Sequence, residues 1–215
     1  MSIETAIFDN KVVQNWWDRL QLSEAELQEK NSTRWPGHYR PQLQRCKTWD
    51  QAMLTDGFRA LWFALVDAQE NHHDPESQKC RWQASYEAWA TVAMVLSHLR
   101  KSHRRPFGLT MAGANKDNKT QKIVPDTNER GEKRTKPIVS DLRLHQLLAA
   151  NDETEFAIRM IRTIKLVDAT ADPLEVACDI LQWFRERDLD YNEKGPNRLA
   201  VRWGMHYYNA YPHVD

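Results

Sequence analysis

The sequence has few cysteines, few glycines and no long apolar run, and each shortage excludes a class of protein. Its three cysteines, Cys46, Cys80 and Cys178, are widely separated and form no C-x-x-C pair, which favours reduced thiols over a disulfide framework. No stretch approaches the 18 consecutive apolar residues of a membrane-spanning helix, so we expect no membrane contact. The first six residues lack the basic and apolar segments of a signal peptide, and we therefore expect a cytoplasmic protein.

The pattern of apolar residues predicts helices at both ends of the chain. Phe58, Leu61, Trp62 and Leu65 follow the spacing of an amphipathic helix, and a longer helix is predicted over roughly 81–100. Capping signals begin short helices at Ser23, and Asp172 before a proline begins another. With only seven glycines in 215 residues and no alternation of period two, we predict no strands and few tight turns.

These patterns predict an all-α protein of two packed helical bundle halves joined by a long basic loop. The predicted halves are residues 1–101 and 139–215, and they could equally form one continuous domain. Residues 102–138 form the predicted loop, which is rich in Gly, Pro, Asn and Lys and has no aromatic residue after Phe107. We expect this loop to be partly disordered and to contribute nothing to the core.

A net charge of zero hides a strongly uneven distribution. Residues 100–136 hold 11 Lys or Arg and 4 Asp or Glu, a balance of +7, which leaves 19 bases and 26 acids, or −7, in the rest of the chain. Such polarity favours a polyanion partner, although a solvated loop without a partner has the same composition. From charge alone, the candidate nucleic-acid contacts are Arg100, Lys101, Arg104 and Arg105.

No motif for catalysis or cofactor binding is present. The sequence lacks a phosphate-binding glycine loop, a nucleophile elbow and an H-E-x-x-H motif. His72, His73 and Cys80 do not have the spacing of a standard zinc site, so we predict no metal and no cofactor. Most of the nine tryptophans fall at helical spacing and are predicted to pack in the core; Trp35 and Trp49 are the candidates for stacking on bases.

Several segments, taken together and in order, resemble one known family. Each is only a set of apolar and arginine residues at helical spacing, but their joint presence is more specific. The segments are Trp16–Leu20, Tyr39–Cys46, Leu54–Trp62, Ser97–Arg100, Pro137–Leu148, Asp179–Trp183 and Arg202–Tyr208. In this order they are similar to the CasB family, the small subunit of the type I-E CRISPR complex Cascade, over nearly the whole chain.

The resemblance implies an all-helical subunit without catalytic activity. Members of this family sit as a dimer in the complex and contact the backbone filament, which carries the CRISPR RNA. They stabilise the R-loop by holding the target and the displaced, non-target DNA strands, and the large subunit is a further expected partner. The resemblance adds Arg45, Arg143 and Arg185 as nucleic-acid-binding residues. The basic segment 112–137 looks longer than in compact members, so it either reaches the displaced strand or is a tolerated insertion.

Two other functions remain open on the sequence alone. A free-standing helical nucleic-acid-binding regulator would need a recognition helix that presents Asn, Gln or Arg to base edges, and no helix-turn-helix is identifiable. A helical enzyme would have to use the region from His72 to Cys80. Binding assays distinguish the regulator from the Cascade subunit, because only the regulator prefers one duplex sequence on its own.

Overall fold

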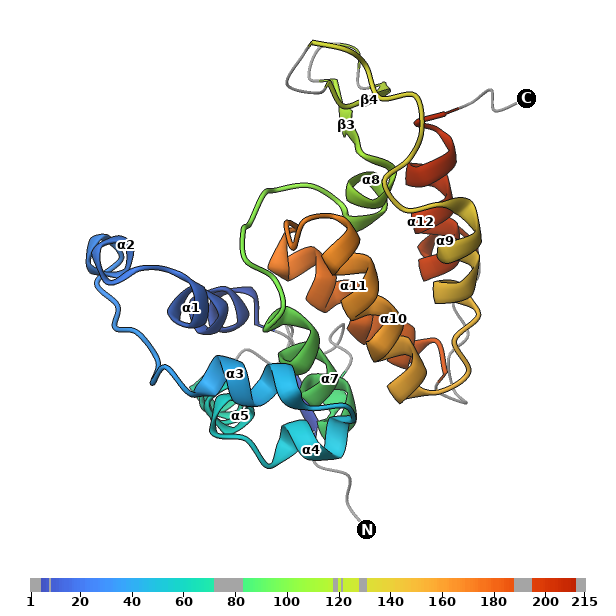
Figure 1. The fold of residues 1–215 in the computed structure, drawn as a ribbon. Coiled ribbons are helices and arrows are strands. Elements are labelled where there is room, and N and C mark those ends of the chain that lie inside the picture. The colour runs from blue at the N-terminus through green and yellow to red at the C-terminus, as the bar shows by residue number, and fades with distance from the viewer. Residues whose placement is uncertain are drawn as a thin grey trace.

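Helices dominate the structure, and the prediction of an all-α fold is confirmed. The computed structural model describes residues 5–7, 9–71, 83–117, 120, 122–127, 131–187 and 195–211. In chain order the elements are β1 (Thr5–Ile7), α1 (Asn10–Gln21), α2 (Glu24–Glu29), α3 (Tyr39–Arg45), α4 (Trp49–Met53), α5 (Asp56–Asn71), β2 (Gln83–Ser85), α7 (Tyr86–Leu96), α8 (Phe107–Ala112), β3 (Ala114–Lys116), β4 (Ile123–Pro125), α9 (Asp141–Leu148), α10 (Glu153–Leu166), α11 (Pro173–Arg185), the 3-10 turn η1 (Gly195–Asn197) and α12 (Leu199–Tyr208). Figure 1 shows their arrangement.

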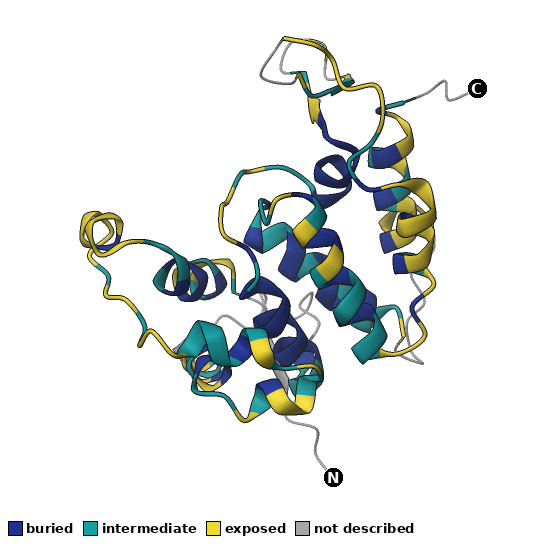
Figure 2. Ribbon diagram, viewed as in Figure 1, coloured by how far each residue is buried: buried dark blue, intermediate teal, exposed yellow. Residues whose placement is uncertain are grey.

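Helix α7 lies at the centre of the fold. Every residue from Ala88 to Leu96 is buried, as expected for a helix that is apolar on all sides and enclosed by other elements. It contacts α3, α4 and α5 from the N-terminal part of the chain and α10 and α11 from the C-terminal part (Figures 1 and 2). One hydrophobic cluster therefore contains residues from both predicted halves, and their division into separate units remains a prediction.

Helix starts follow the predicted capping signals. Ser23 and Glu26 form the reciprocal capping box that begins α2, and Asp172 accepts a hydrogen bond from Leu174 N (2.9 Å) with Pro173 as the first residue of α11. The helix predicted over 81–100 is shorter, because Ser85 caps its start at Tyr86 and the helix ends at Leu96, with Ser97 as its C-cap. Local sequence therefore located the starts of α2 and α11 and misjudged the length of the central helix.

The expectation that residues 102–138 contribute nothing to the core is wrong for Phe107–Ala112. All six of these residues are buried and form α8, which packs against α12. Gly108 makes this close packing possible. A Cβ at this position would come within 2.9 Å of His206 Cβ and 3.2 Å of Trp203 Cα. The segment is thus partly a core element, held by contacts with residues almost 100 positions away.

The prediction of no strands is also wrong in detail. The strands that the structure describes form two antiparallel pairs, β1 with β2 and β3 with β4, each strand three residues long. Strands this short leave no alternating pattern that can be recognised in a sequence. Among the described residues, no helix has the length and apolarity needed to cross a bilayer.

Candidate nucleic-acid interface

The basic run, residues 100–105, is fixed to the connection between α10 and α11. The backbone N–H groups of Arg100 and Lys101 donate to the carbonyl of Ala169 (2.8 and 3.2 Å), and Ala171 N–H donates to the carbonyl of Lys101 (3.2 Å). These bonds pin the backbone, whereas the side chains of Arg100, Lys101 and Arg104 are exposed. The run therefore presents cations from a fixed position, as a phosphate-binding surface requires.

A groove of about 1210 Å³ runs beside the basic run. Its other walls come from α1, α2 and the first turns of α11, elements that are distant in sequence. Its polar and charged lining residues include Lys11, Gln14, Asp18, Glu26, Lys30, Arg100, Lys101, Arg104, Arg105, Asp172 and Glu175. All four basic residues that charge alone singled out lie on this one surface.

The acids in the groove are largely engaged within the protein. Asp18 is buried and accepts hydrogen bonds from Lys30 Nζ (2.5 Å) and Gln14 Nε2 (2.8 Å). Glu26 belongs to the capping box of α2 and Asp172 caps α11. Burial raises the pKa of Glu175, and the nearby Asp172 adds to this effect. Six bases and four acids line the groove, so its net charge is positive and favours an anion despite its mixed composition.

Arg105 differs from the rest of the basic run. Its guanidinium forms an ion pair with Asp126 (2.6 Å), and the two side chains are only 21% and 30% exposed. By contrast, Arg100, Lys101 and Arg104 have no ion-pair partner within 4 Å in the part of the chain that the structure describes. Three of these four predicted residues are thus available to a ligand, and the fourth already has a carboxylate partner.

A second group of cations lies at the C-terminal end of α7. Arg40 donates from Nε to the carbonyl of Ser97 (3.0 Å) and from Nη2 to that of Leu99 (3.5 Å), and so caps the helix. Its pKa is lowered by burial and then by the neighbouring Arg100 and Arg34. Burial, and then Lys165 and Arg40, lowers the pKa of the adjacent His98 to about 4.

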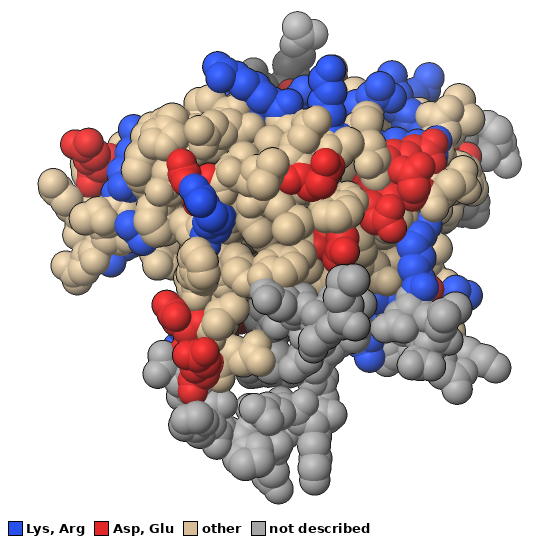
Figure 3. Space-filling view, turned by 90° about the horizontal axis from the view of Figure 1, so that it is seen from below, with Lys and Arg blue, Asp and Glu red and all other residues tan. Residues whose placement is uncertain are grey.

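These electrostatic neighbours define what we call the α7-end cluster: Arg34, Arg40, Arg100 and Lys165. Arg100 also lines the groove, so the cluster adjoins the groove at this residue. On the face seen in Figure 3, Lys and Arg side chains gather along the upper edge, and the acids lie below them, with one group directly beneath on the right. Sequence reasoning named Arg100 but missed the cluster as a whole, because its members come from four separate segments and Arg34, Arg40 and Lys165 were not named as candidates.

Arg45, Arg143 and Arg185 lie on three different helices. Arg45 is exposed at the end of α3, Arg143 is exposed on α9, and Arg185 is half-buried as the last residue of α11. None of them is among the described residues that line the groove. Their role in nucleic-acid binding therefore remains a prediction, separate from the groove.

The two tryptophans considered for base stacking have partners within the protein. The guanidinium carbon of Arg19 lies 3.3 Å from the ring centroid of Trp35, and Tyr39 stacks with the same ring at 5.8 Å. Trp49 packs, partly buried, against the hydrophobic core. A base could stack on Trp35 only by displacing these neighbours, so the structure does not support the stacking hypothesis.

The described residues offer no cluster for metal chemistry. Within the described ranges, no three His, Cys, Asp or Glu side chains are placed to hold a metal ion. His72, His73 and Cys80, the suggestion that the sequence offered for such a site, lie outside the described residues. The groove and the basic run instead present Lys and Arg side chains, which attract anions.

Comparison with known proteins gives one family. Residues 40–208 match the family model described as CRISPR-associated protein Cse2. The matched region begins in α3 and ends with the last residue of α12, so it contains the basic run, three members of the α7-end cluster, and Arg45, Arg143 and Arg185. No curated protein and no solved structure matches the chain.

Proposed function

The chain belongs to the Cse2 family, the CasB small subunit of type I-E Cascade, and we propose that it stabilises the R-loop of that complex by holding nucleic-acid backbone. The observation that carries the proposal is the basic run, where Arg100, Lys101 and Arg104 are exposed at the rim of a groove. The backbone of Arg100 and Lys101 is held there by hydrogen bonds to the connection between α10 and α11. Membership of a Cascade family argues against the alternative of a free-standing regulator.

The mechanism that we propose is electrostatic and independent of sequence. Pairing with the guide reads the target, while the protein grips phosphates and helical shape. Exchange of the DNA duplex for an RNA–DNA heteroduplex is nearly balanced in free energy, so a few phosphate contacts shift it toward the open state. Arginine suits this role because its planar fork donates two hydrogen bonds to phosphate oxygens. Arg40 and Lys165 extend the cationic surface beyond the groove.

The partners that we propose are the CRISPR RNA, the target and non-target DNA strands, the backbone filament, the large subunit and a second copy of this chain in a dimer. Exposed apolar side chains support protein contacts of this kind. Leu142 on α9 and Val201, Met205 and Tyr208 on α12 are all exposed. We also propose that the subunit acts in the cytoplasm and without catalysis, as the family resemblance implies.

The first prediction concerns the basic run. Replacing Arg100, Lys101 and Arg104 together by alanine should shorten the lifetime of the R-loop on the assembled complex, because three phosphate contacts are lost. The slope of log K against log salt concentration for target binding should become shallower by roughly two to three, at about 0.7–0.9 per contact. The measurement is target dissociation from reconstituted complexes over a salt series.

The matched control removes three exposed cations elsewhere, Lys47, Arg162 and Arg198. It lowers the net charge equally but leaves the basic run intact, so it should have a much smaller effect. A third variant without Arg45, Arg143 and Arg185 tests the residues that the resemblance suggested. Equal lifetimes for the basic-run variant and the control would overturn the proposed site.

A further inference from the structure

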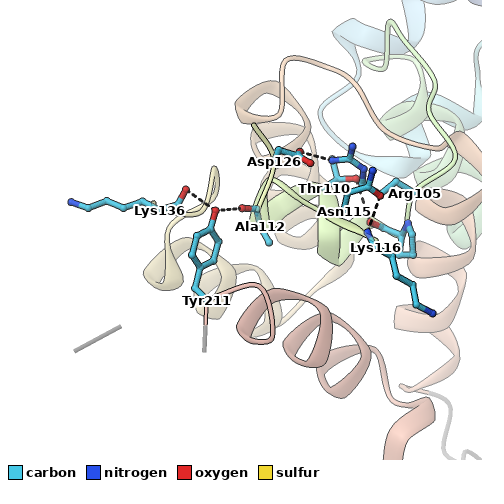
Figure 4. A network of polar contacts seen from close by, with 9 residues as sticks. Arg105, Thr110, Ala112, Asn115, Lys116, Asp126, Lys136 and Tyr211 are labelled. Carbon is cyan, nitrogen blue, oxygen red and sulfur yellow. Dashed lines mark hydrogen bonds and ion pairs between the residues drawn. The ribbon is translucent and has the colours of Figure 1, made fainter. Parts of the chain in front are cut away.

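Hydrogen bonds and close packing hold the two ends of the β3–β4 hairpin in place. Gly113 turns the chain out of α8 with φ +66°, where a side chain would collide with Arg134. Asp126 N–H donates to the carbonyl of Gly113 (2.8 Å), and Arg134 N–H donates to the carbonyl of Asp126 (2.8 Å). The Tyr211 hydroxyl bonds the carbonyls of Ala112 and Lys136, both at 3.2 Å (Figure 4). The described residues among 113–136, which we call the arm, therefore start and end on fixed points.

The ion pair between Arg105 and Asp126 ties this base to the basic run (Figure 4). Because both side chains are mostly buried, the pair is screened less than a surface pair, and loss of one partner leaves the other charge uncompensated. Asp126 also pairs through its backbone with both Gly113 and Arg134. One residue thus sets where the returning strand lies relative to Arg105.

The arm carries exposed cations of its own. Its described residues include five bases, Lys116, Lys122, Lys133, Arg134 and Lys136, and three acids, Asp117, Asp126 and Glu132. Asp126 is neutralised by Arg105, so the exposed arm is basic. Lys116, Lys122 and Lys133 are exposed on the hairpin and the bridge below it.

We propose that the arm is a second phosphate-contacting surface and that Arg105 and Asp126 are the positioning residues that hold it beside the groove. The inference rests on the proposed function. It changes the role first assigned to Arg105, which acts here through Asp126 rather than on phosphate. A guanidinium already bonded to a carboxylate and mostly buried is poorly placed to take a further anion.

The test is whether Asp126→Asn strengthens or weakens the binding of target DNA. Asp126→Asn removes a negative charge, so a purely electrostatic surface would bind nucleic acid more tightly. If the ion pair positions the arm, the same variant in the assembled complex binds target DNA more weakly, and the salt slope falls by roughly two to three as the contacts of Lys116, Lys122 and Lys133 are lost. The charge-matched control is Glu132→Gln, an exposed acid on the arm.

Two further variants separate positioning from folding. Asp126→Glu keeps a carboxylate at this position and should bind target DNA more tightly than Asp126→Asn does. The double variant Arg105→Asp with Asp126→Arg should do the same, because it keeps the ion pair although position 105 no longer carries a cation. Thermal unfolding of each variant shows whether the fold is intact. Binding by Asp126→Asn as tight as by Glu132→Gln, or loss of binding in the exchange variant equal to that of Arg105→Ala, would overturn the inference.

The basic-run variant, measured beside these, separates this inference from the proposed function. If it retains the R-loop as well as the unaltered subunit does, the proposed function fails. If it weakens retention while Asp126→Asn behaves like Glu132→Gln, only the role of the arm fails. If the complexes do not incorporate the Asp126→Asn subunit although it is folded, the arm contacts a protein partner, and the proposal of a phosphate surface is wrong.

Discussion

At the scale of single residues, His98 combines burial with a position beside the α7-end cluster. It lies just beyond the C-terminal end of α7, where Arg40 bonds two backbone carbonyls and Lys165 is close. Its imidazole is partly buried, and a proton on it would add a further charge to the α7-end cluster. The neutral form is therefore favoured, and the pKa falls to about 4.

The second prediction follows from this pKa. The unfolded chain protonates His98 near its ordinary value of about 6.5, whereas the folded chain does so near 4. Between these values the unfolded state binds more protons, so the contribution of His98 to stability is complete above pH 6.5 and is lost as the pH falls toward 4. Urea unfolding of His98→Gln from pH 4 to 7 should show a shallower fall than the unaltered chain. Parallel curves would contradict the assignment.

Individual residues of the candidate site were predictable only where charge is dense in the sequence. Arg100, Lys101 and Arg104 stand out because four bases occur within six positions, and the structure shows these three exposed on one surface. The partner of Arg105 could not be foreseen, since Asp126 lies 21 positions away in a segment rich in polar residues. Arg34 and Lys165 likewise have nothing local that marks them.

Among elements, those with local signals were predicted and those that depend on distant contacts were not. The start of α11 is encoded by Asp172 and Pro173 alone. Helix α8 has only six residues, too short to be stable by itself, and it exists because α12 covers it. Its composition, with Gly108 as the second residue, looks unfavourable for a helix until the packing against Trp203 and His206 is known.

The third prediction tests that packing. Gly108→Ala places a methyl group against His206 and the backbone of Trp203, so the free energy of unfolding should fall by about 1–3 kcal/mol. Gly37→Ala is the control, because a Cβ there meets nothing within 4 Å. Denaturant unfolding of both variants measures the difference. A Gly108→Ala protein as stable as the control would show that α8 and α12 are less tightly packed than described.

Across the whole molecule, one hydrophobic core holds together the segments that carry the excess of basic residues and those that carry the excess of acidic residues. The chain is neutral overall, yet its cations converge from α3, the basic run and α10 while several acids are engaged in caps and ion pairs. A neutral subunit of this kind joins a large assembly without strong repulsion and still offers phosphate a local positive field. Composition predicted the polarity, and only the fold shows that the α7-end cluster and the groove share Arg100.

The central claim is that this subunit keeps the opened target open. The most direct measurement is the lifetime of the R-loop on type I-E complexes assembled with and without this chain, at several salt concentrations. The account predicts a shorter lifetime without the chain and a weaker dependence on salt, because the phosphate contacts are gone. Equal lifetimes with equal salt dependence would contradict it.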